Sequence, residues 1–310
     1  MPVLIFRSGS DRTQWWLDTF RERAPEIEVR PWSEPGDKAD ITHALVWDPE
    51  PGVLTSMPNL KLIISLGAGV DHLFRDPDVP LQVPIARVVD VNLTARMTEY
   101  VVLYVLRHHR HVPLYEARQR ESLWQSEPQP AAFDRTVGIM GMGTLGRDAA
   151  EKLVELGFRV TGWTRTPRQM EGVESFHGEA GFAPFLASAE ILVNLLPLTP
   201  QTVNIIDAKL LAALPEGAYF INVGRGPHVV DKDLVAALDS GHLSGAVLDV
   251  FRKEPLPAGD PFWRHPKITL TPHVASMSDP RTVIEQVIEN VRRTERGEAP
   301  LNRVDPQQQY

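Results

Sequence analysis

The sequence contains no cysteine among its 310 residues. This absence excludes disulfide bonds, thiolate nucleophiles and cysteine metal sites, so catalysis must use oxygen and nitrogen groups. Long hydrophobic runs are also missing, since no apolar stretch approaches the ~18 residues of a membrane span. Residues 1–6 are too short, and too soon followed by Arg7 and Asp11, to form a signal peptide. We therefore expect a cytoplasmic protein with no membrane partner.

An excess of basic charge is missing as well, because 40 acidic residues outnumber 32 basic ones and give a formal net charge of −8. No basic stripe outweighs this acidic surplus, so a nucleic-acid partner is not expected. The hydrophobic and charged fractions, 43% and 23%, are ordinary for a soluble globular protein. The length suggests about two domains and is sufficient to bury a large core.

The most informative stretch runs from Thr136 to Thr164. An apolar run over Val137–Met140 predicts a buried strand, apolar residues at helical spacing over Leu145–Leu156 predict a helix, and Phe158–Trp163 predicts a second strand. The turn between strand and helix has the spacing G-x-G-x-x-G, at Gly141, Gly143 and Gly146. In this context the spacing predicts dinucleotide binding, because the glycine backbone can approach a pyrophosphate whose charge the helix N-terminus receives.

The end of the second strand lacks the acidic residue that usually binds the ribose 2′-hydroxyl of NAD. Its place is taken by hydroxyl and guanidinium groups within the segment Trp163, Thr164, Arg165, Thr166 and Arg168. Such groups can bind a 2′-phosphate through charge-assisted hydrogen bonds. We therefore predict NADPH as cofactor, with NADH as a weaker ligand. The alternative is that Arg165 and Arg168 are ordinary solvated loop charges.

Alternation of strands and helices extends over the whole chain. Further strands are expected at Val3–Phe6, His43–Trp47, Leu60–Ser65, Pro84–Val89, Val173–Phe176, Ile191–Leu196, Ala218–Val223, Gly245–Val250 and Lys267–Thr271. Further helices are expected at Asp11–Arg23, Thr94–His109, Glu179–Ala187, Ala208–Leu214, Asp231–Leu238 and about Pro280–Arg296. This pattern predicts an α/β fold of two Rossmann-like, doubly wound parallel-sheet domains. The first domain is discontinuous if the last helix packs back onto it, giving residues 1–99 plus 278–310 and residues 100–277.

Three other features leave alternatives open. The turn Gly67-Ala68-Gly69 after a predicted strand either directs backbone amides at an anion or is a plain tight turn. The histidines at 108, 109 and 111 lie among arginines with no adjacent carboxylate, so we interpret them as cations near a helix C-terminus and predict no metal site. Trp124 lies in a loop expected over Ser122–Phe133 and could be core, interface anchor or substrate wall.

In a doubly wound sheet, ligands bind outside the carboxyl ends of the strands. Notable groups follow four of the predicted strands: Leu196-Pro197-Leu198-Thr199, Asn222-Val223-Gly224-Arg225-Gly226, Asp249 with Glu254 five residues later, and Thr271-Pro272-His273. In the reduction of a carbonyl group, His273 is the natural proton donor at neutral pH. Glu254 would orient its ring, and Arg225 offers a planar fork for a substrate carboxylate.

The sequence resembles the D-isomer-specific 2-hydroxyacid dehydrogenases in six segments that occur in order along nearly the whole chain. These are GAGVDH from Gly67, GMGTLG from Gly141, LLPLTPQT from Leu195, NVGRG from Asn222, LDVFRKEPLP from Leu248 and TPHVA from Thr271. Segments such as DRTQWWLDTF, LVWDP and GWTRTP resemble the glyoxylate/hydroxypyruvate reductase A branch. One departure is Gly224, where relatives often carry alanine.

The resemblance implies a catalytic group of Arg225, Glu254 and His273, a homodimer formed mainly through the cofactor domain, and reduction of small 2-keto acids with NADPH. The implied products are glycolate from glyoxylate and D-glycerate from hydroxypyruvate. The first domain would bind substrate, with Trp47, Ala68 and Gly69 joining Arg225 and His273, although Trp47 and Trp124 could equally be packing residues. The full set expected at the cofactor is Gly141, Met142, Gly143, Thr144, Leu145, Gly146, Trp163, Thr164, Arg165, Thr166, Arg168, Leu196, Pro197, Thr202, Val223, Gly224, Asp249 and His273.

Two rival functions remain open. One is an NADH-linked dehydrogenase for another substrate, of the D-lactate or phosphoglycerate type. The other is a dinucleotide-sensing interaction protein, which would bind NAD(H) and turn over keto acids poorly.

Overall fold

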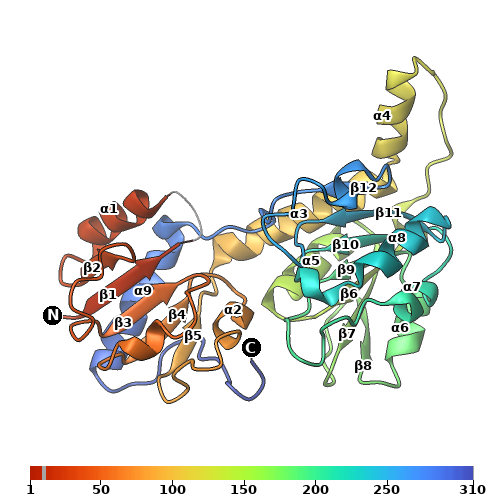
Figure 1. Cartoon of the computed structure of the whole chain (residues 1–310). Helices are drawn as coiled ribbons and strands as arrows, with labels where there is room; N and C mark the ends of the chain where they lie inside the picture. The colour runs from red at the N-terminus through yellow and green to blue at the C-terminus, as the bar shows by residue number, and fades with distance from the viewer. Residues whose placement is uncertain (9–11, 310) are drawn as a thin grey trace. The chain divides into compact units, whose positions relative to one another are not determined.

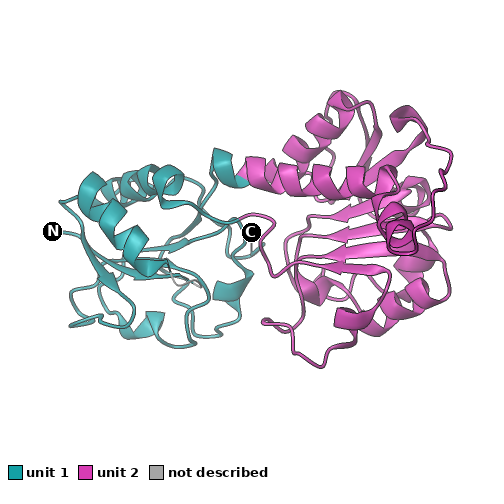
Figure 2. Ribbon diagram, turned by 90° about the horizontal axis from the view of Figure 1, so that it is seen from above, with its two compact units in different colours: residues 1–93, 277–310 teal, residues 94–276 magenta. Residues whose placement is uncertain are grey.

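A computed structural model describes residues 1–8 and 12–309 of the chain. The chain divides into two compact units, unit 1 with residues 1–93 and 277–310, and unit 2 with residues 94–276 (Figure 2). Each unit is a parallel sheet with helices packed on it, so the predicted α/β fold of two parallel-sheet domains is confirmed. Within the described residues, no helix has the length and apolar character needed to cross a membrane.

Unit 1 contains a five-stranded sheet with the order β2-β1-β3-β4-β5, in which every pair is parallel. This is the flavodoxin-like order. Its strands are β1 Val3–Arg7, β2 Glu28–Pro31, β3 His43–Val46, β4 Leu62–Ser65 and β5 Ile85–Arg87. The sequence analysis missed β2, because this edge strand is only half-buried and has no continuous apolar run.

The helices of unit 1 are α1 Thr13–Arg23, α2 Asp71–Phe74 and α9 Pro280–Glu295, with a 3₁₀ turn η1 at Leu54–Ser56. The predicted start of the first helix, Asp11, lies outside the described residues. Helix α9 packs against α1 and β4 (Figure 1) through an apolar face of Val283, Ile284, Val287, Ile288 and Val291. The C-terminal part of the chain is therefore built into the core of unit 1.

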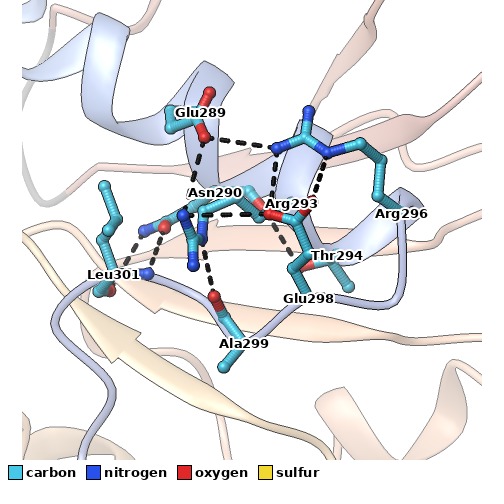
Figure 3. A network of polar contacts seen from close by, with 8 residues as sticks. All are labelled: Glu289, Asn290, Arg293, Thr294, Arg296, Glu298, Ala299 and Leu301. Carbon is cyan, nitrogen blue, oxygen red and sulfur yellow. Dashed lines mark hydrogen bonds and ion pairs between the residues drawn. The ribbon is translucent and has the colours of Figure 1, made fainter.

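A polar network at the end of α9 holds the chain that follows it (Figure 3). The fully buried Asn290 accepts a hydrogen bond from the Leu301 N–H at 2.7 Å and donates one to the Leu301 carbonyl at 3.3 Å. Nearby, Nε of Arg293 donates to the carbonyl of Ala299 at 2.7 Å. The segment fixed in this way continues along β5, where Asn302 accepts a hydrogen bond from the Arg87 N–H.

Unit 2 contains a seven-stranded sheet with the order β12-β11-β10-β9-β6-β7-β8, again entirely parallel. Its strands are β6 Thr136–Met140, β7 Arg159–Thr164, β8 Val173–His177, β9 Ile191–Asn194, β10 Ala218–Asn222, β11 Leu243–Leu248 and β12 Ile268–Leu270. From β6 the chain continues outward through β7 and β8 to one edge of the sheet. It then returns to β9, on the other side of β6, and continues to the opposite edge. This reversal is the topological switch point at which doubly wound sheets bind ligands.

The helices of unit 2 are the greater part of α3 Val91–His109, α4 Val112–Arg120, α5 Thr144–Glu155, α6 Phe182–Ser188, α7 Ala208–Ala212 and α8 Asp231–Asp239. Short 3₁₀ turns lie at η2 Ala132–Asp134, η3 Gly226–His228 and η4 Pro261–Arg264. Helix α4 extends away from the sheet of its unit (Figure 1) and has no buried residue. The sequence analysis missed it because a helix without a buried face has no apolar periodicity.

The histidines at the end of α3 are packing residues. The ring of His108 stacks on Tyr219 with centroids 4.1 Å apart, and the ring of His109 meets Phe158 edge-on. Burial, assisted by the nearby charge of Arg135, lowers the pKa of His108 to about 3. The interpretation of this residue as a cation is therefore wrong, because the ring is held neutral among aromatic side chains.

Candidate functional site

The glycine turn of unit 2 joins β6 to α5 at the switch point. Gly141 has φ of 101°, and a Cβ there would lie 2.7 Å from the Leu195 carbonyl oxygen, whereas a Cβ on Gly146 would lie 2.1 Å from the Gly141 oxygen. Gly143, the N-cap of α5, has nothing within 4 Å of its Cβ position, and no side chain caps the helix. Thr144 beside it is exposed, while Met142 and Leu145 pack inward. The open helix N-terminus fits a pyrophosphate.

The end of β7 and the segment after it carry the side chains that the sequence predicts at the ribose 2′-position of a dinucleotide. Thr164 Oγ1 donates to the Thr166 carbonyl at 2.7 Å, and Nη1 of Arg168 donates to the Met142 carbonyl at 3.4 Å. Trp163 instead donates through Nε1 to the carbonyl of Gly178 and packs on Phe182. Its indole is therefore engaged in packing within unit 2.

A small pocket adjoins this segment and contains a residue that the sequence analysis missed. The pocket is lined by Met142, Arg147, Gly162, Thr164, Arg168, Gln169, Met170 and Ser175. Arg147 comes from the first turns of α5, directly after the last glycine of the motif. Neither Arg147 nor Arg168 has a carboxylate partner within the part of the chain that the structure describes. Two unneutralised guanidinium groups at one pocket fit a phosphate group. Arg165 does not line the pocket.

The loop after β9 is held by its own hydroxyl groups. Leu196 is buried, and Pro197 is exposed next to it. Thr202 Oγ1 donates to the Pro197 carbonyl at 2.8 Å and accepts from the Thr199 N–H at 2.8 Å. Thr202 therefore stabilises the conformation of this loop, independently of any ligand that the loop binds.

A close side-chain contact joins two of the predicted catalytic residues, His273 and Glu254. Nδ1 of His273 lies 2.7 Å from Oε2 of Glu254, and the Phe251 N–H donates to the other oxygen, Oε1, at 2.8 Å. Burial alone would raise the pKa of Glu254, but the hydrogen bond and charge of His273, with a smaller effect of the Arg225 charge, lower it below its ordinary value. About a third of each side chain stays exposed, 31% for His273 and 35% for Glu254. The pair is ionisable, oriented and accessible.

Asp249 holds the backbone that carries His273. Its carboxylate is buried and accepts from Thr271 Oγ1 at 2.6 Å, from the Val274 N–H at 2.8 Å and from the Ala275 N–H at 2.9 Å. The His273 N–H donates to the Asp249 carbonyl at 2.8 Å, and His273 has φ of 53°. These bonds stabilise a left-handed backbone that histidine seldom adopts. The contact of Asp249 with the cofactor, expected from the sequence, stays a prediction.

Arg225 follows β10 and is placed by a buried network that sequence reasoning missed. The Arg225 N–H donates to Nδ1 of His228 at 3.1 Å, so the other ring nitrogen carries the proton and donates to the Pro197 carbonyl at 3.2 Å. Asn194 donates to both His228 and Asn222 at 2.9 Å. His228, Asn194 and Asn222 are fully buried. The only signal of this network in the sequence is that two neighbouring strands, β9 and β10, each end in an asparagine.

The residues before Arg225 leave little space. Val223 is buried, and its N–H donates to the Asn194 carbonyl at 3.2 Å. A Cβ on Gly224 would lie 2.9 Å from Nδ2 of Asn194. An alanine at this position would therefore require the Asn194 amide to shift, so Gly224 bears on the packing of the network.

In unit 1, the predicted substrate residues lie at the carboxyl ends of β3 and β4. The N–H groups of Ala68 and Gly69 make no hydrogen bond among the described residues. The ring of Trp47 lies 4.5 Å from that of His72 and fills the space beside Gly67, where a Cβ would lie 2.7 Å from the indole. Two unpaired amides in one turn favour the anion-binding interpretation over a plain turn.

Comparison with known proteins agrees with this geometry. Residues 102–275 match the family model for the D-isomer specific 2-hydroxyacid dehydrogenase, NAD binding domain. The chain is 41% identical over 308 residues to a glyoxylate/hydroxypyruvate reductase A from Yersinia enterocolitica, and the match covers 97% of this chain and 98% of that relative.

Two solved structures are similar over the whole chain. A D-isomer specific 2-hydroxyacid dehydrogenase from Xanthobacter autotrophicus Py2, in complex with NADPH and MES, is 45% identical with a TM-score of 0.95, covering 100% of this chain and 99% of that one. An NADPH-dependent glyoxylate/hydroxypyruvate reductase from Sinorhizobium meliloti, in complex with NADP and sulfate, is 40% identical with a TM-score of 0.94 at the same coverage. The chain therefore belongs to the D-isomer specific 2-hydroxyacid dehydrogenase family.

Proposed function

We propose that this chain is an NADPH-dependent reductase of small 2-keto acids, which converts glyoxylate to glycolate and hydroxypyruvate to D-glycerate. Unit 2 would be the dinucleotide-binding domain and unit 1 the substrate-binding domain. The observation that carries the proposal is the oriented pair of His273 and Glu254, at the same sheet edge as Arg225 and an open glycine turn. The names of the relatives from Yersinia enterocolitica and Sinorhizobium meliloti support the choice of substrates.

NADPH, when bound, supplies a hydride to the carbonyl carbon of the substrate. The carbonyl oxygen then needs a proton, and His273 is placed to deliver it. Because the ionised Glu254 accepts from Nδ1, the opposite nitrogen of the imidazolium, Nε2, is the one that can donate to substrate. Glu254 thus fixes the orientation of the ring and determines which nitrogen is left for the substrate.

The substrate carboxylate would be held by Arg225. The guanidinium donates from Nη1 to its neighbouring carbonyl at Gly224 at 2.8 Å, which limits the directions in which the fork can point. The unpaired amides of Ala68 and Gly69 would bind the other side of the carboxylate. Trp47 would form part of the wall beside this turn.

The preference for NADPH would come from the pocket at the end of β7. Arg168 and Arg147 would contact the 2′-phosphate, with the Thr164 hydroxyl beside them. No carboxylate side chain lines the pocket to repel that phosphate. The complexes of the two similar structures with NADPH and NADP support the choice of cofactor.

One assay separates the proposal from its rivals. Oxidation of NADPH and of NADH is measured with glyoxylate, hydroxypyruvate, pyruvate and 2-oxoglutarate. We expect the highest kcat/KM with NADPH and the first two acids. A preference for NADH with pyruvate would favour a D-lactate type of enzyme, and tight dinucleotide binding with negligible turnover would favour a sensing protein.

The homodimer and the cytoplasmic location remain part of this proposal. Exposed apolar side chains of unit 2 occur on α3, on α4 and in the segment that follows α4, at Leu103, Leu114, Tyr115, Leu123, Trp124 and Phe133. Trp124 is fully exposed, so of the three alternatives for it only interface anchor and substrate wall remain. Such an exposed apolar set on unit 2 is typical of an interface. Light scattering at several protein concentrations would measure the mass in solution.

A further inference from the structure

Among the residues that the structure describes, Arg87, the last residue of β5, is a cation without an acidic partner. Within the same residues, its side chain makes one hydrogen bond, from Nη1 to the carbonyl of Ala68 at 3.2 Å. Across the described parts of unit 1, no carboxylate lies within ion-pair distance of it. None of its nitrogen atoms is both buried and unpaired, so the N–H groups that lack a protein partner are open to solvent or ligand.

The backbone of Arg87 is held firmly. It is the register partner of Ser65, the last residue of β4, and its N–H donates to the Asn302 carbonyl at 3.2 Å. Its own carbonyl accepts from Nε2 of Gln286 at 2.9 Å. The guanidinium therefore projects from a rigid position beside the turn that follows β4.

The turn itself is fixed from the opposite side by a directed chain of hydrogen bonds. The Asp48 N–H donates to Nδ1 of His72 at 3.2 Å, so Nε2 of His72 carries the proton and donates to Ser65 Oγ at 2.9 Å. Ser65 Oγ then donates to the Gly69 carbonyl at 2.7 Å. Both carbonyls of the turn, at Ala68 and Gly69, are thus bound from within unit 1, whereas the amides of the same two residues have no hydrogen-bond partner in the described part of the chain.

We propose that Arg87 is a substrate-positioning residue, which fixes the Ala68-Gly69 turn through the Ala68 carbonyl and supplies the positive charge of an anion site for the substrate carboxylate. The inference rests on the proposed function, because it assigns a second charged residue to the same keto acid. A hydrogen-bond donor on the Ala68 carbonyl polarises the peptide group whose N–H belongs to Gly69. Arg87 would therefore both fix this peptide group and strengthen its N–H as a donor to the substrate carboxylate.

Burial lowers the pKa of the Arg87 guanidinium from its ordinary value. The group nevertheless stays charged at neutral pH, since arginine is not deprotonated in proteins. A half-buried cation that pairs with no carboxylate costs free energy in the ligand-free protein, and a bound carboxylate would offset that cost.

The test compares Arg87→Met, which removes charge and donor, with Arg87→Lys, which keeps the charge. Arg75→Met is the matched control, because this exposed cation of the same unit already pairs with Asp48 at 2.7 Å. KM and kcat are measured for glyoxylate with saturating NADPH, and the Kd for oxamate is measured by calorimetry on enzyme saturated with NADP⁺. Thermal melts establish that each variant is folded. KM is a suitable readout because its value does not depend on the fraction of active enzyme.

For Arg87→Met we expect KM for glyoxylate and Kd for oxamate to rise about tenfold or more, with kcat changed less than about threefold. Arg87→Lys should recover a large part of that loss, and Arg75→Met should match wild type. Unchanged KM and Kd in Arg87→Met, or equal losses in the Met and Lys variants, would overturn the proposal. If the wild-type enzyme reduced no 2-keto acid, the proposed function would fail instead, and oxamate binding would still report on Arg87.

Discussion

Nδ1 of His273 and Oε2 of Glu254 lie 2.7 Å apart, although the two residues are 19 positions apart in the chain. The contact requires the left-handed backbone at His273, which the Asp249 carboxylate stabilises through the following amides. The ends of two neighbouring strands, β11 and β12, therefore cooperate to orient a single imidazole ring.

The first prediction concerns this pair. His273→Ala should lower kcat by about 10²–10⁴-fold, because the proton donor is lost. Glu254→Gln should lower kcat by about tenfold or more, since the charge-assisted hydrogen bond that orients the His273 ring is lost. Steady-state kinetics measure both, and fluorescence titration should give an unchanged Kd for NADPH. A kcat near the wild-type value in His273→Ala would remove its role as donor.

The second prediction concerns cofactor choice at the pocket beside β7. Arg147→Ala and Arg168→Ala should each raise the Kd for NADPH by about tenfold, because each removes a charge-assisted bond to the 2′-phosphate. The Kd for NADH should stay the same. Arg120→Ala, at the exposed end of α4, is the control. Equal losses for both dinucleotides would show that the arginines support the fold and do not select the phosphate.

The third prediction concerns the backbone that carries Arg225. A Cβ on Gly226 would lie 1.8 Å from the carbonyl carbon of Phe251, so Gly226→Ala must displace one of two site segments. We expect a loss of about 1–3 kcal/mol in the free energy of unfolding, together with a lower kcat/KM. Gly259→Ala, where nothing lies within 4 Å, should change neither quantity. Chemical denaturation measures the difference, and a wild-type midpoint for Gly226→Ala would contradict the packing.

The fourth prediction concerns the dependence of stability on pH. His43 is fully buried in β3, and burial lowers its pKa from 6.5 to about 4, with Glu295 partly opposing the shift. As the pH falls below 6.5, the unfolded chain takes up a proton that the folded protein does not, so the folded state loses stability until about pH 4. At about pH 5 the loss from this residue is about 2 kcal/mol.

His43→Gln removes this titration. Denaturation at about pH 7 and about pH 5 should therefore give a smaller difference in stability for the variant than for wild type. Identical differences for the two proteins would mean that His43 is protonated in the folded state.

Local patterns predicted much of this protein. Periodicity over ten to twenty residues identified nearly every buried strand, and the glycine spacing located the turn at the switch point, because both depend on neighbouring residues alone. Elements without an apolar pattern, namely β2 and α4, escaped detection. The side chains that follow the strands were visible in the sequence because parallel strands place their ends at one edge.

Only the tertiary structure decided how those side chains are used. The sequence predicted Asp249 as a contact of the cofactor. In the structure, its buried carboxylate accepts hydrogen bonds from the backbone that follows His273. His108 looked like a cation and is a neutral ring on Tyr219. Arg87 carried no motif, and its importance depends on an Ala68 carbonyl 19 residues away and on the lack of an acid. Charge state and hydrogen-bond partners follow from burial and from residues distant in the chain, which no local pattern contains.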